Sequence, residues 1–208
     1  SASLFNNSMS DLSKAGSLES RKAISSNTSA FSVTASTSAN ASIFSIDVNS
    51  IGQRQSLKTS SLVDATNTSV GDASTVIGGG ELTITTQQGD QFVVAIDANQ
   101  STLADIATAI NAANDNPGIQ ATIVNADSGP VLVLNTADTG TAHKMTLSVS
   151  DDDGNNTDAI GLSQLGYDPN NSSASSMQSI LDAENAEIIV NGQLINSTSG
   201  SVFADVIE

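Results

Sequence analysis

The sequence predicts a mainly β protein of the α+β class, built from antiparallel sheets with one or two short helices. Three observations support this prediction. Apolar and polar residues alternate with a period of two in several separate segments, which is typical of half-buried strands. A clear helical period occurs only after Thr102. Aromatic residues make up 3% of the 208-residue chain and Trp is absent, so Val, Ile, Leu and Ala must fill the core, which favours thin sheets.

The N-terminal region changes character near residue 30. Residues 1–30 are rich in Ser, Asn and Ala, with only a weak apolar stripe, so we expect the frayed end of a helical stalk or a disordered segment. Residues 31–36 then alternate, and residues 44–48 do so again after a polar turn. These two segments predict a pair of strands joined by a short loop.

The next segment, residues 58–80, is rich in Ser, Thr, Asn and Gly, so we interpret it as a linker or domain crossing. It closes with Gly78-Gly79-Gly80. A phosphate-binding glycine loop needs a preceding strand, a following helix and usually a Lys, and none of these is predicted here.

Residues 81–136 have the most regular pattern, which predicts two strands, a helix and two further strands. The strands are expected near 81–85, 92–96, 119–124 and 131–134. Thr102-Leu-Ala-Asp105 matches a capping box, after which apolar residues recur at helical spacing until Pro117-Gly118 ends the helix. We expect one small sheet with the helix across one face.

Beyond this unit, residues 145–149 alternate as a further strand, and residues 151–180 are polar and loop-like. Asn191-Gly192 lies between apolar residues, and this dipeptide favours the type I′ turn of a tight hairpin. A last strand is expected through Val202 and Val206.

Charge and composition narrow the possible partners. The net charge is −16, and it is unevenly distributed, because residues 61–208 hold nineteen acidic residues against Lys144 alone. Such a field repels phosphates, which argues against nucleic acid as a partner. No run approaches the roughly 18 apolar residues of a membrane-spanning helix, no signal peptide is visible, and the absence of Cys means that the fold relies on its sheets.

No catalytic, cofactor-binding or metal-binding residue is predicted. His143 is the single His, no Cys is present, and no Ser lies in a nucleophile elbow, so a catalytic triad and a zinc site lack their components. Asp151-Asp152-Asp153 begins a segment that resembles a calcium loop. An EF-hand needs Gly and Glu where this chain has Asn156 and Leu162, so we expect a solvated turn.

Several segments together resemble the FliD family of bacterial flagellar filament-capping proteins (flagellar hook-associated protein 2). The first hairpin of the family is similar to residues 31–37 and 45–56, although Gly52 and Arg54 replace small Ala residues. The insert motif that flagellins share with caps is similar to residues 81–85, 101–113 and 132–140. The segment that returns toward the stalk is similar to residues 182–192 and 205–208.

The resemblance implies two antiparallel-sheet domains, the second inserted in the first. The first domain would combine residues 31–62 and 179–208, and the inserted β-β-α-β-β domain would span residues 63–178. It also implies a structural role without covalent chemistry or cofactors. The protein would be secreted without a cleaved signal peptide and would form a ring of identical copies at the tip of the flagellum, where flagellin folds and joins the filament.

The resemblance leaves a second function open, that of an adhesin binding host or surface glycans. Its marker would be aromatic side chains exposed for stacking on sugars, and within the insertion only Phe92 and Tyr167 are candidates.

Overall fold

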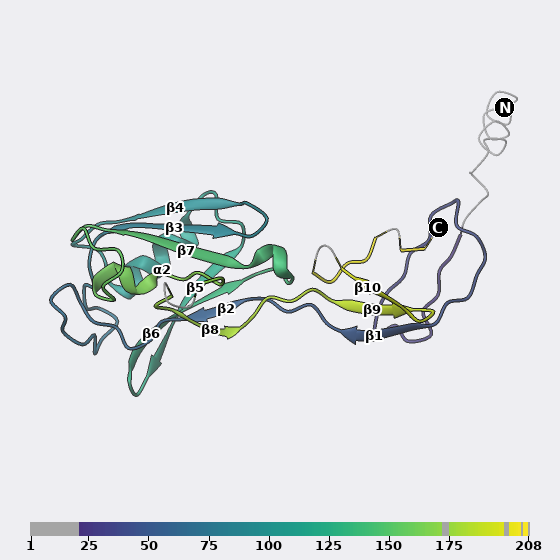
Figure 1. Ribbon diagram of the computed structural model, residues 1–208, viewed down its shortest axis with the longest axis horizontal. Coiled ribbons are helices and arrows are strands. Elements are labelled where there is room, and N and C mark those ends of the chain that lie inside the picture. Colours follow the sequence, from purple (N-terminus) through teal and green to yellow (C-terminus); the bar gives the residue numbers. More distant parts are fainter. Residues whose placement is uncertain (1–20, 172–174, 198–199, 205, 208) are drawn as a thin grey trace, which may run out of the picture.

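The computed structural model describes residues 21–171, 175–197, 200–204 and 206–207, and it has the mainly antiparallel β architecture that the sequence predicts. The described chain is elongated, with two β units joined by a narrow neck (Figure 1). We call residues 55–183 the larger unit, and residues 21–54 with 184–207 the smaller unit. The predicted stalk end at residues 1–20 lies outside the described residues.

The larger unit contains two antiparallel sheets. One sheet has the order β4-β3-β7, with β3 at Gly80–Thr86, β4 at Gln91–Ile96 and β7 at Met145–Asp151. The other has the order β5-β6-β2-β8, with β2 at Ser56–Lys58, β5 at Ile119–Ala126, β6 at Gly129–Thr136 and β8 at Gln178–Leu181. All strand pairs are antiparallel.

The strands form where the sequence alternates. In β3, β4 and β6 every second side chain is buried, as the period of a pleated strand requires. Leu82 of β3, for example, lies opposite Val94 of β4 and Val149 of β7, which places three apolar side chains in one row across the sheet.

The helix α2 (Leu103–Ala112) begins at the predicted capping box. The Thr102 hydroxyl accepts a hydrogen bond from the backbone N–H of Asp105 at 3.1 Å, and the Asp105 carboxylate accepts one from the backbone N–H of Thr102 at 3.2 Å. α2 packs against both β5 and β4, so it joins the two sheets. The expected single sheet is therefore wrong, because β5 and β6 pair with β2 rather than with β3 or β4.

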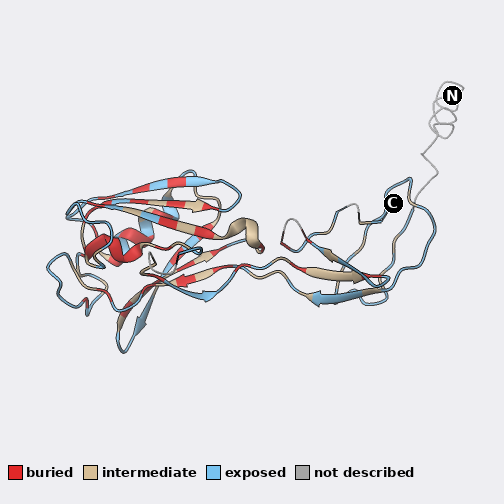
Figure 2. Ribbon diagram, viewed as in Figure 1, coloured by how far each residue is buried: buried red, intermediate tan, exposed pale blue. Residues whose placement is uncertain are grey.

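One hydrophobic core lies between these elements (Figure 2). Its fully buried large side chains come from both sheets, α2 and the connecting segments: Leu57, Ile77, Leu82, Ile84, Leu103, Ile106, Ile110, Leu132, Leu134, Met145, Leu162 and Leu165. None of the core cluster belongs to the smaller unit.

Two segments expected to be irregular contribute to this core. The interpretation of residues 58–80 as a linker is wrong, since Leu62, Val70 and Ile77 are buried in the larger unit. Within the predicted loop 151–180, the short 3-10 helix η2 (Gly161–Leu165) is buried along its whole length. Each of these segments is anchored by a few apolar residues in an otherwise polar sequence. Because these residues do not recur at a regular spacing, periodicity does not reveal that the segments are buried.

The smaller unit is a three-stranded sheet of order β1-β9-β10, formed by β1 (Ile46–Ser50), β9 (Glu187–Val190) and β10 (Gln193–Asn196). The predicted hairpin turn is confirmed, because Asn191 and Gly192 have φ values of 48° and 84°.

Two strand predictions in the smaller unit are wrong. Residues 31–36 form no strand, and β1 instead pairs with β9, which is distant in sequence. The described residues of the expected final strand, 202–204 and 206–207, are also irregular. No helix within the described ranges is long and apolar enough to cross a membrane.

The neck is held by backbone contacts between segments of both units. Gln53 and Glu184 form an antiparallel bridge, and the Gln53 carbonyl also accepts a hydrogen bond from the Gly140 N–H at 2.9 Å. A Cβ on Gly140 would lie 2.6 Å from the Cα of Gly200, so only glycine permits this close approach.

Candidate interaction surfaces

The residues considered for chemistry lie apart from one another. His143 is half-buried in the short 3-10 helix η1 (Thr141–His143), beside the neck. Among the described residues, no group of three or more His, Cys, Asp or Glu side chains is placed to hold a metal ion. The arrangement therefore offers neither a nucleophile paired with a base nor a metal centre in the part of the chain that the structure describes.

Asp151 is a structural residue at the end of β7. It is only 8% exposed, and its carboxylate accepts hydrogen bonds from the backbone N–H of Ser163 at 2.9 Å and of Asp153 at 3.3 Å. Asn156 accepts a hydrogen bond from the Asp151 N–H at 2.7 Å. Residues 152–157 are exposed, as expected of a solvated turn, and Asp151 alone is buried. These bonds attach η2 to the sheet.

The triple glycine has a packing explanation. Gly80 begins β3 with a φ of 144°, and a Cβ there would collide with the carbonyl oxygen of Ser150 on β7. A Cβ on Gly79 would lie 2.8 Å from the Cα of Ala98. The glycines thus allow backbones to approach closely at the start of the strand.

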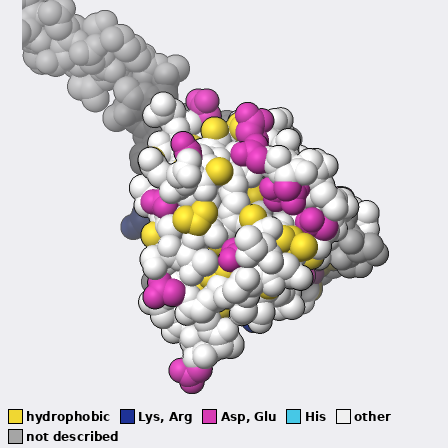
Figure 3. All heavy atoms as spheres, turned by 90° about the vertical axis from the view of Figure 1, so that its left-hand side faces the viewer, with side chains coloured by type: hydrophobic (Ala, Val, Ile, Leu, Met, Phe, Trp, Pro, Cys, Tyr) yellow, Lys and Arg dark blue, Asp and Glu magenta, His cyan; other side chains and the backbone are white. Residues whose placement is uncertain are grey.

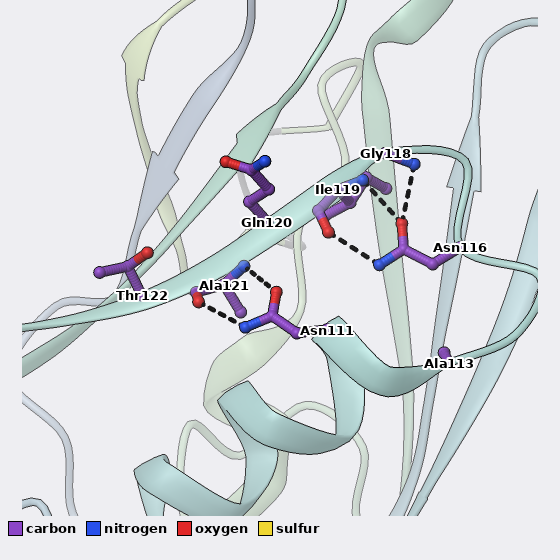
Figure 4. A pocket seen from close by; sticks show the side chains of 8 residues that line it. All are labelled: Asn111, Ala113, Asn116, Gly118, Ile119, Gln120, Ala121 and Thr122. Atoms are coloured by element: carbon purple, nitrogen blue, oxygen red, sulfur yellow. Dashed lines mark hydrogen bonds between the residues drawn. The ribbon is translucent and has the colours of Figure 1, made fainter.

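A shallow hollow, with a volume of about 530 Å³, lies beside β5 (Figure 4). The Asn111 amide bonds the N–H and the C=O of Ala121, each at 2.8 Å, and Asn116 bonds those of Ile119 at 2.6 and 2.7 Å. Each amide thus imitates the backbone of a neighbouring strand and satisfies part of the outer edge of β5. The two asparagine amides that line this hollow are therefore already used.

The two aromatic candidates for sugar stacking are not accessible. Phe92 is 4% exposed and Tyr167 is 7% exposed, both within the core. Burial raises the pKa of Tyr167, and the nearby Asp182 and Asp168 carboxylates raise it further. The marker expected for a glycan-binding head is therefore missing at both positions.

The free end of the larger unit is acidic. Figure 3 shows Asp and Glu side chains spread over this end, with small apolar groups between them. The Thr66 hydroxyl and the Thr68 N–H bond the Asp64 carboxylate and lower its pKa, and the Ser74 N–H and hydroxyl lower that of Asp72. Hydrogen bonding thus favours the charged form of these two carboxylates.

Exposed apolar side chains are concentrated on the smaller unit. Eight large hydrophobic residues are exposed there against five in the larger unit, which has more than twice as many described residues. The eight are Ile24, Ile43, Phe44, Val48, Ile51, Leu194, Val202 and Ile207. The described part of the smaller unit thus leaves a larger share of its apolar side chains accessible than the larger unit does.

Comparisons with known proteins agree with the resemblance in the sequence. The Flagellin hook IN motif matches residues 81–139, which run from β3 through β6, and the N-terminus of flagellar hook-associated protein 2 matches residues 1–55.

Curated relatives match most of the chain. Flagellar hook-associated protein 2 of Escherichia coli K12 is 35% identical over 195 residues, and the B-type protein of Pseudomonas aeruginosa PAO1 is 33% identical over 193. These alignments cover 92% and 90% of the chain but 38% of each relative. The chain thus spans well under half of the length of these relatives.

Solved structures show the same architecture. The D2-D3 domains of the flagellar cap protein FliD from Escherichia coli align with a TM-score of 0.64 at 29% identity, covering 84% of this chain and 83% of that one. FliD from Pseudomonas aeruginosa aligns with a TM-score of 0.63 at 29% identity, covering 82% and 72%. With sequence motifs, curated relatives and fold in agreement, the chain belongs to the FliD family, that of flagellar hook-associated protein 2.

Proposed function

We propose that this chain is the head of a structural cap at the distal end of a bacterial flagellar filament. The whole protein assembles with copies of itself, and promotes the folding and polymerisation of flagellin that motility requires. It acts by shape and contact and is not an enzyme. It reaches the filament tip by secretion.

The observation that carries this proposal is the match to the Escherichia coli D2-D3 structure of the cap protein, of which the chain covers 83%. The architecture also supports it. The described residues form antiparallel sheets, whose surfaces can contact other proteins.

The proposal is tested in the organism that carries the protein. Deleting the gene should shorten the filaments and release unpolymerised flagellin into the medium, and the full-length gene should restore both. Filament length by electron microscopy and flagellin in the culture supernatant are the measurements. Filaments of normal length in the deletion strain would contradict the cap function.

Assembly in solution gives a further prediction. Because the chain carries a net charge of −16, copies repel one another at low ionic strength, and salt shortens the range of this repulsion to about 10 Å at 0.1 M. We expect the fragment of residues 1–208 to be monomeric or weakly associated at low salt, and its mean mass to rise with added salt. Light scattering measures this, and an unchanged mass would count against it.

The adhesin alternative has no comparable support. Phe92 and Tyr167 are buried, and no other aromatic side chain lies among the residues 63–178 of the predicted insertion. A glycan array probed with the full-length protein tests it directly, and specific retention of a glycan would revive it.

A further inference from the structure

We propose that Asn111 and Asn116 protect the outer edge of β5, so that this edge does not pair with a strand from another chain. The proposal gives a role to two side chains, and it does not depend on the cap function proposed above. Every contact that supports it lies within the larger unit.

The outer edge of β5 is regular along its whole length. β5 lies at one end of the sheet order β5-β6-β2-β8, and it keeps an unbroken register with β6 over all eight residues, from Ile119 opposite Thr136 to Ala126 opposite Gly129. Every second residue of such a strand turns its backbone N–H and C=O away from the partner strand. An edge of this kind can pair with a strand from another chain.

The contacts of β5 and β6 show which backbone groups face outward. Asn111 bonds the N–H and the C=O of Ala121 from the side away from β6. Two residues further on, Ile123 lies opposite Leu132, which bonds Thr59 through both its N–H and its C=O at 3.0 Å and thus faces away from β5. The outward-facing positions are therefore Ile119, Ala121, Ile123 and Asn125.

Side-chain amides occupy the first half of this edge (Figure 4). Asn111 donates to the C=O of Ala121 and accepts from its N–H, each at 2.8 Å, and Asn116 does the same for Ile119 at 2.7 and 2.6 Å. A carboxamide has a donor and an acceptor side by side, so it can bond both groups as a paired strand would. The outward backbone groups of Ile123 and Asn125 have no such partner among the described residues.

The sequence of β5 offers no other protection. Residues 119–126 contain no charged residue and no Pro, and the register with β6 has no bulge, although charges, Pro and bulges are the usual features that protect an edge strand. The exposed side chains Gln120, Thr122 and Val124 are uncharged. An uncharged segment of this length with β-branched residues is typical of strands that pair between chains.

The other outer strands of the larger unit are protected by different means. Leu147 of β7 exchanges two backbone hydrogen bonds with Tyr167, at 2.7 and 3.0 Å, so a second segment covers that edge. β8 is four residues long and its register with β2 shifts. β4 lies between Asp90 and Asp97. In β5 the two amides take the place of these features.

The first test removes the Asn111 amide from the full-length protein. Asn111 is exposed on α2, so Asn111→Leu should leave the core intact. It deprives the Ala121 N–H of its partner, and we expect this N–H to exchange with solvent roughly tenfold faster or more. Hydrogen exchange resolved to single residues by mass spectrometry measures it. Ile110→Val is the control, because it weakens the buried face of the same helix and leaves the amide in place.

The second test measures strand addition with a fluorescently labelled peptide of residues 119–126, titrated onto each folded variant. Freeing Ala121 adds two backbone hydrogen bonds to those that Ile123 and Asn125 can form with a new strand. We therefore expect the peptide to bind Asn111→Leu roughly tenfold more tightly, or more, than it binds the wild type. Fluorescence anisotropy gives the dissociation constants, and Ile110→Val should match the wild type.

Asn116→Leu should have the same two effects through Ile119. Asn116 also bonds the C=O of Ile110 at 2.9 Å, so its unfolding midpoint is measured alongside and compared with that of Ile110→Val.

Three results would overturn the proposal. Unchanged exchange of the Ala121 N–H in Asn111→Leu would show that the amide does not protect this group. Equal peptide affinity for Asn111→Leu and the wild type would show that something else, such as another segment of the whole protein, covers β5. Equal effects of Asn111→Leu and Ile110→Val would attribute both changes to lost stability.

Discussion

Gln55 shows how a single buried polar side chain can connect the two sheets of the larger unit. It is fully buried just before β2, and its side-chain oxygen accepts a hydrogen bond from the Met145 N–H at the start of β7, at 2.6 Å. Its side-chain nitrogen lies 3.4 Å from the Tyr167 hydroxyl oxygen. Because β2 and β7 belong to different sheets, this residue fixes their relative position.

Replacing Gln55 tests this role. Gln55→Leu leaves the Met145 N–H buried without its partner, so we expect the free energy of unfolding to fall by about 1–3 kcal/mol. Chemical denaturation followed by circular dichroism measures the change. Gln120→Leu makes the same substitution at an exposed position of β5 and should change stability by less than about 0.5 kcal/mol. Similar losses for both variants would contradict the role of Gln55.

At the residue scale, Tyr167 makes the stability of the fold depend on pH. Its pKa is raised above the ordinary value of 10.0, mainly by burial, so the unfolded chain loses this proton at lower pH than the folded one. The contribution of Tyr167 to stability is therefore complete below pH 10 and declines as the pH rises beyond it.

The chain has one Tyr and no Trp, so tyrosinate absorbance reports this group alone. We expect the absorbance titration of the folded protein to be shifted to higher pH than that of the unfolded protein. Tyr167→Phe should flatten the part of the stability profile above pH 10 that comes from this group. Coincident titrations of the folded and unfolded protein would show that burial does not affect the hydroxyl.

At the scale of elements, α2 links the two sheets of the larger unit, so its N-terminal cap affects both. Thr102→Ala removes the hydroxyl that accepts from the Asp105 N–H, and we expect a loss of about 1 kcal/mol in the free energy of unfolding. Thr108→Ala, in the exposed middle of the same helix, is the control and should be neutral or slightly stabilising because Ala has the higher helix propensity. Urea denaturation distinguishes the two, and equal effects would rule out a capping contribution.

At the scale of the whole molecule, the neck determines how the two units are held. Gly140 and Gly200 meet there at a distance that excludes a side chain, and the Asn185 side chain accepts a hydrogen bond from the Thr141 N–H at 2.9 Å. The neck is thus a packed joint between the units, with contacts from four separate segments of the chain (Figure 1).

Gly140→Ala should loosen this joint without unfolding the larger unit. The new Cβ would collide with Gly200, so we expect faster proteolysis between the units and a broader distance distribution between spin labels placed on each. Gly89→Ala is the matched control, because Gly89 has the same φ of 104° and a Cβ there would meet nothing within 4 Å. Gly89→Ala therefore introduces only the backbone strain. Equal proteolysis rates and equal distance distributions for the two variants would contradict a packed neck.

The predictions from sequence were confirmed for elements whose pairing or capping partner lies nearby in the chain. The strands from 81 to 136, the capping box at Thr102 and the turn at Asn191-Gly192 depend on neighbours a few residues away, and the structure confirms them. They failed where the partner is distant. Residues 31–36 have the same alternation as β1 and yet form no strand, because β1 pairs with β9, which lies far along the chain.

The same division between nearby and distant partners applies to the candidate surfaces. The acidity of residues 61–208, the lack of a complete catalytic set and the family motifs are properties of composition and order, and the sequence alone determined them. Only the tertiary structure decided that Phe92 and Tyr167 are buried, that Asp151 holds η2, and that the exposed apolar residues collect on the smaller unit. The physical reason is that burial and edge exposure depend on which distant segments pack together, and a pattern of alternating residues does not specify its partner.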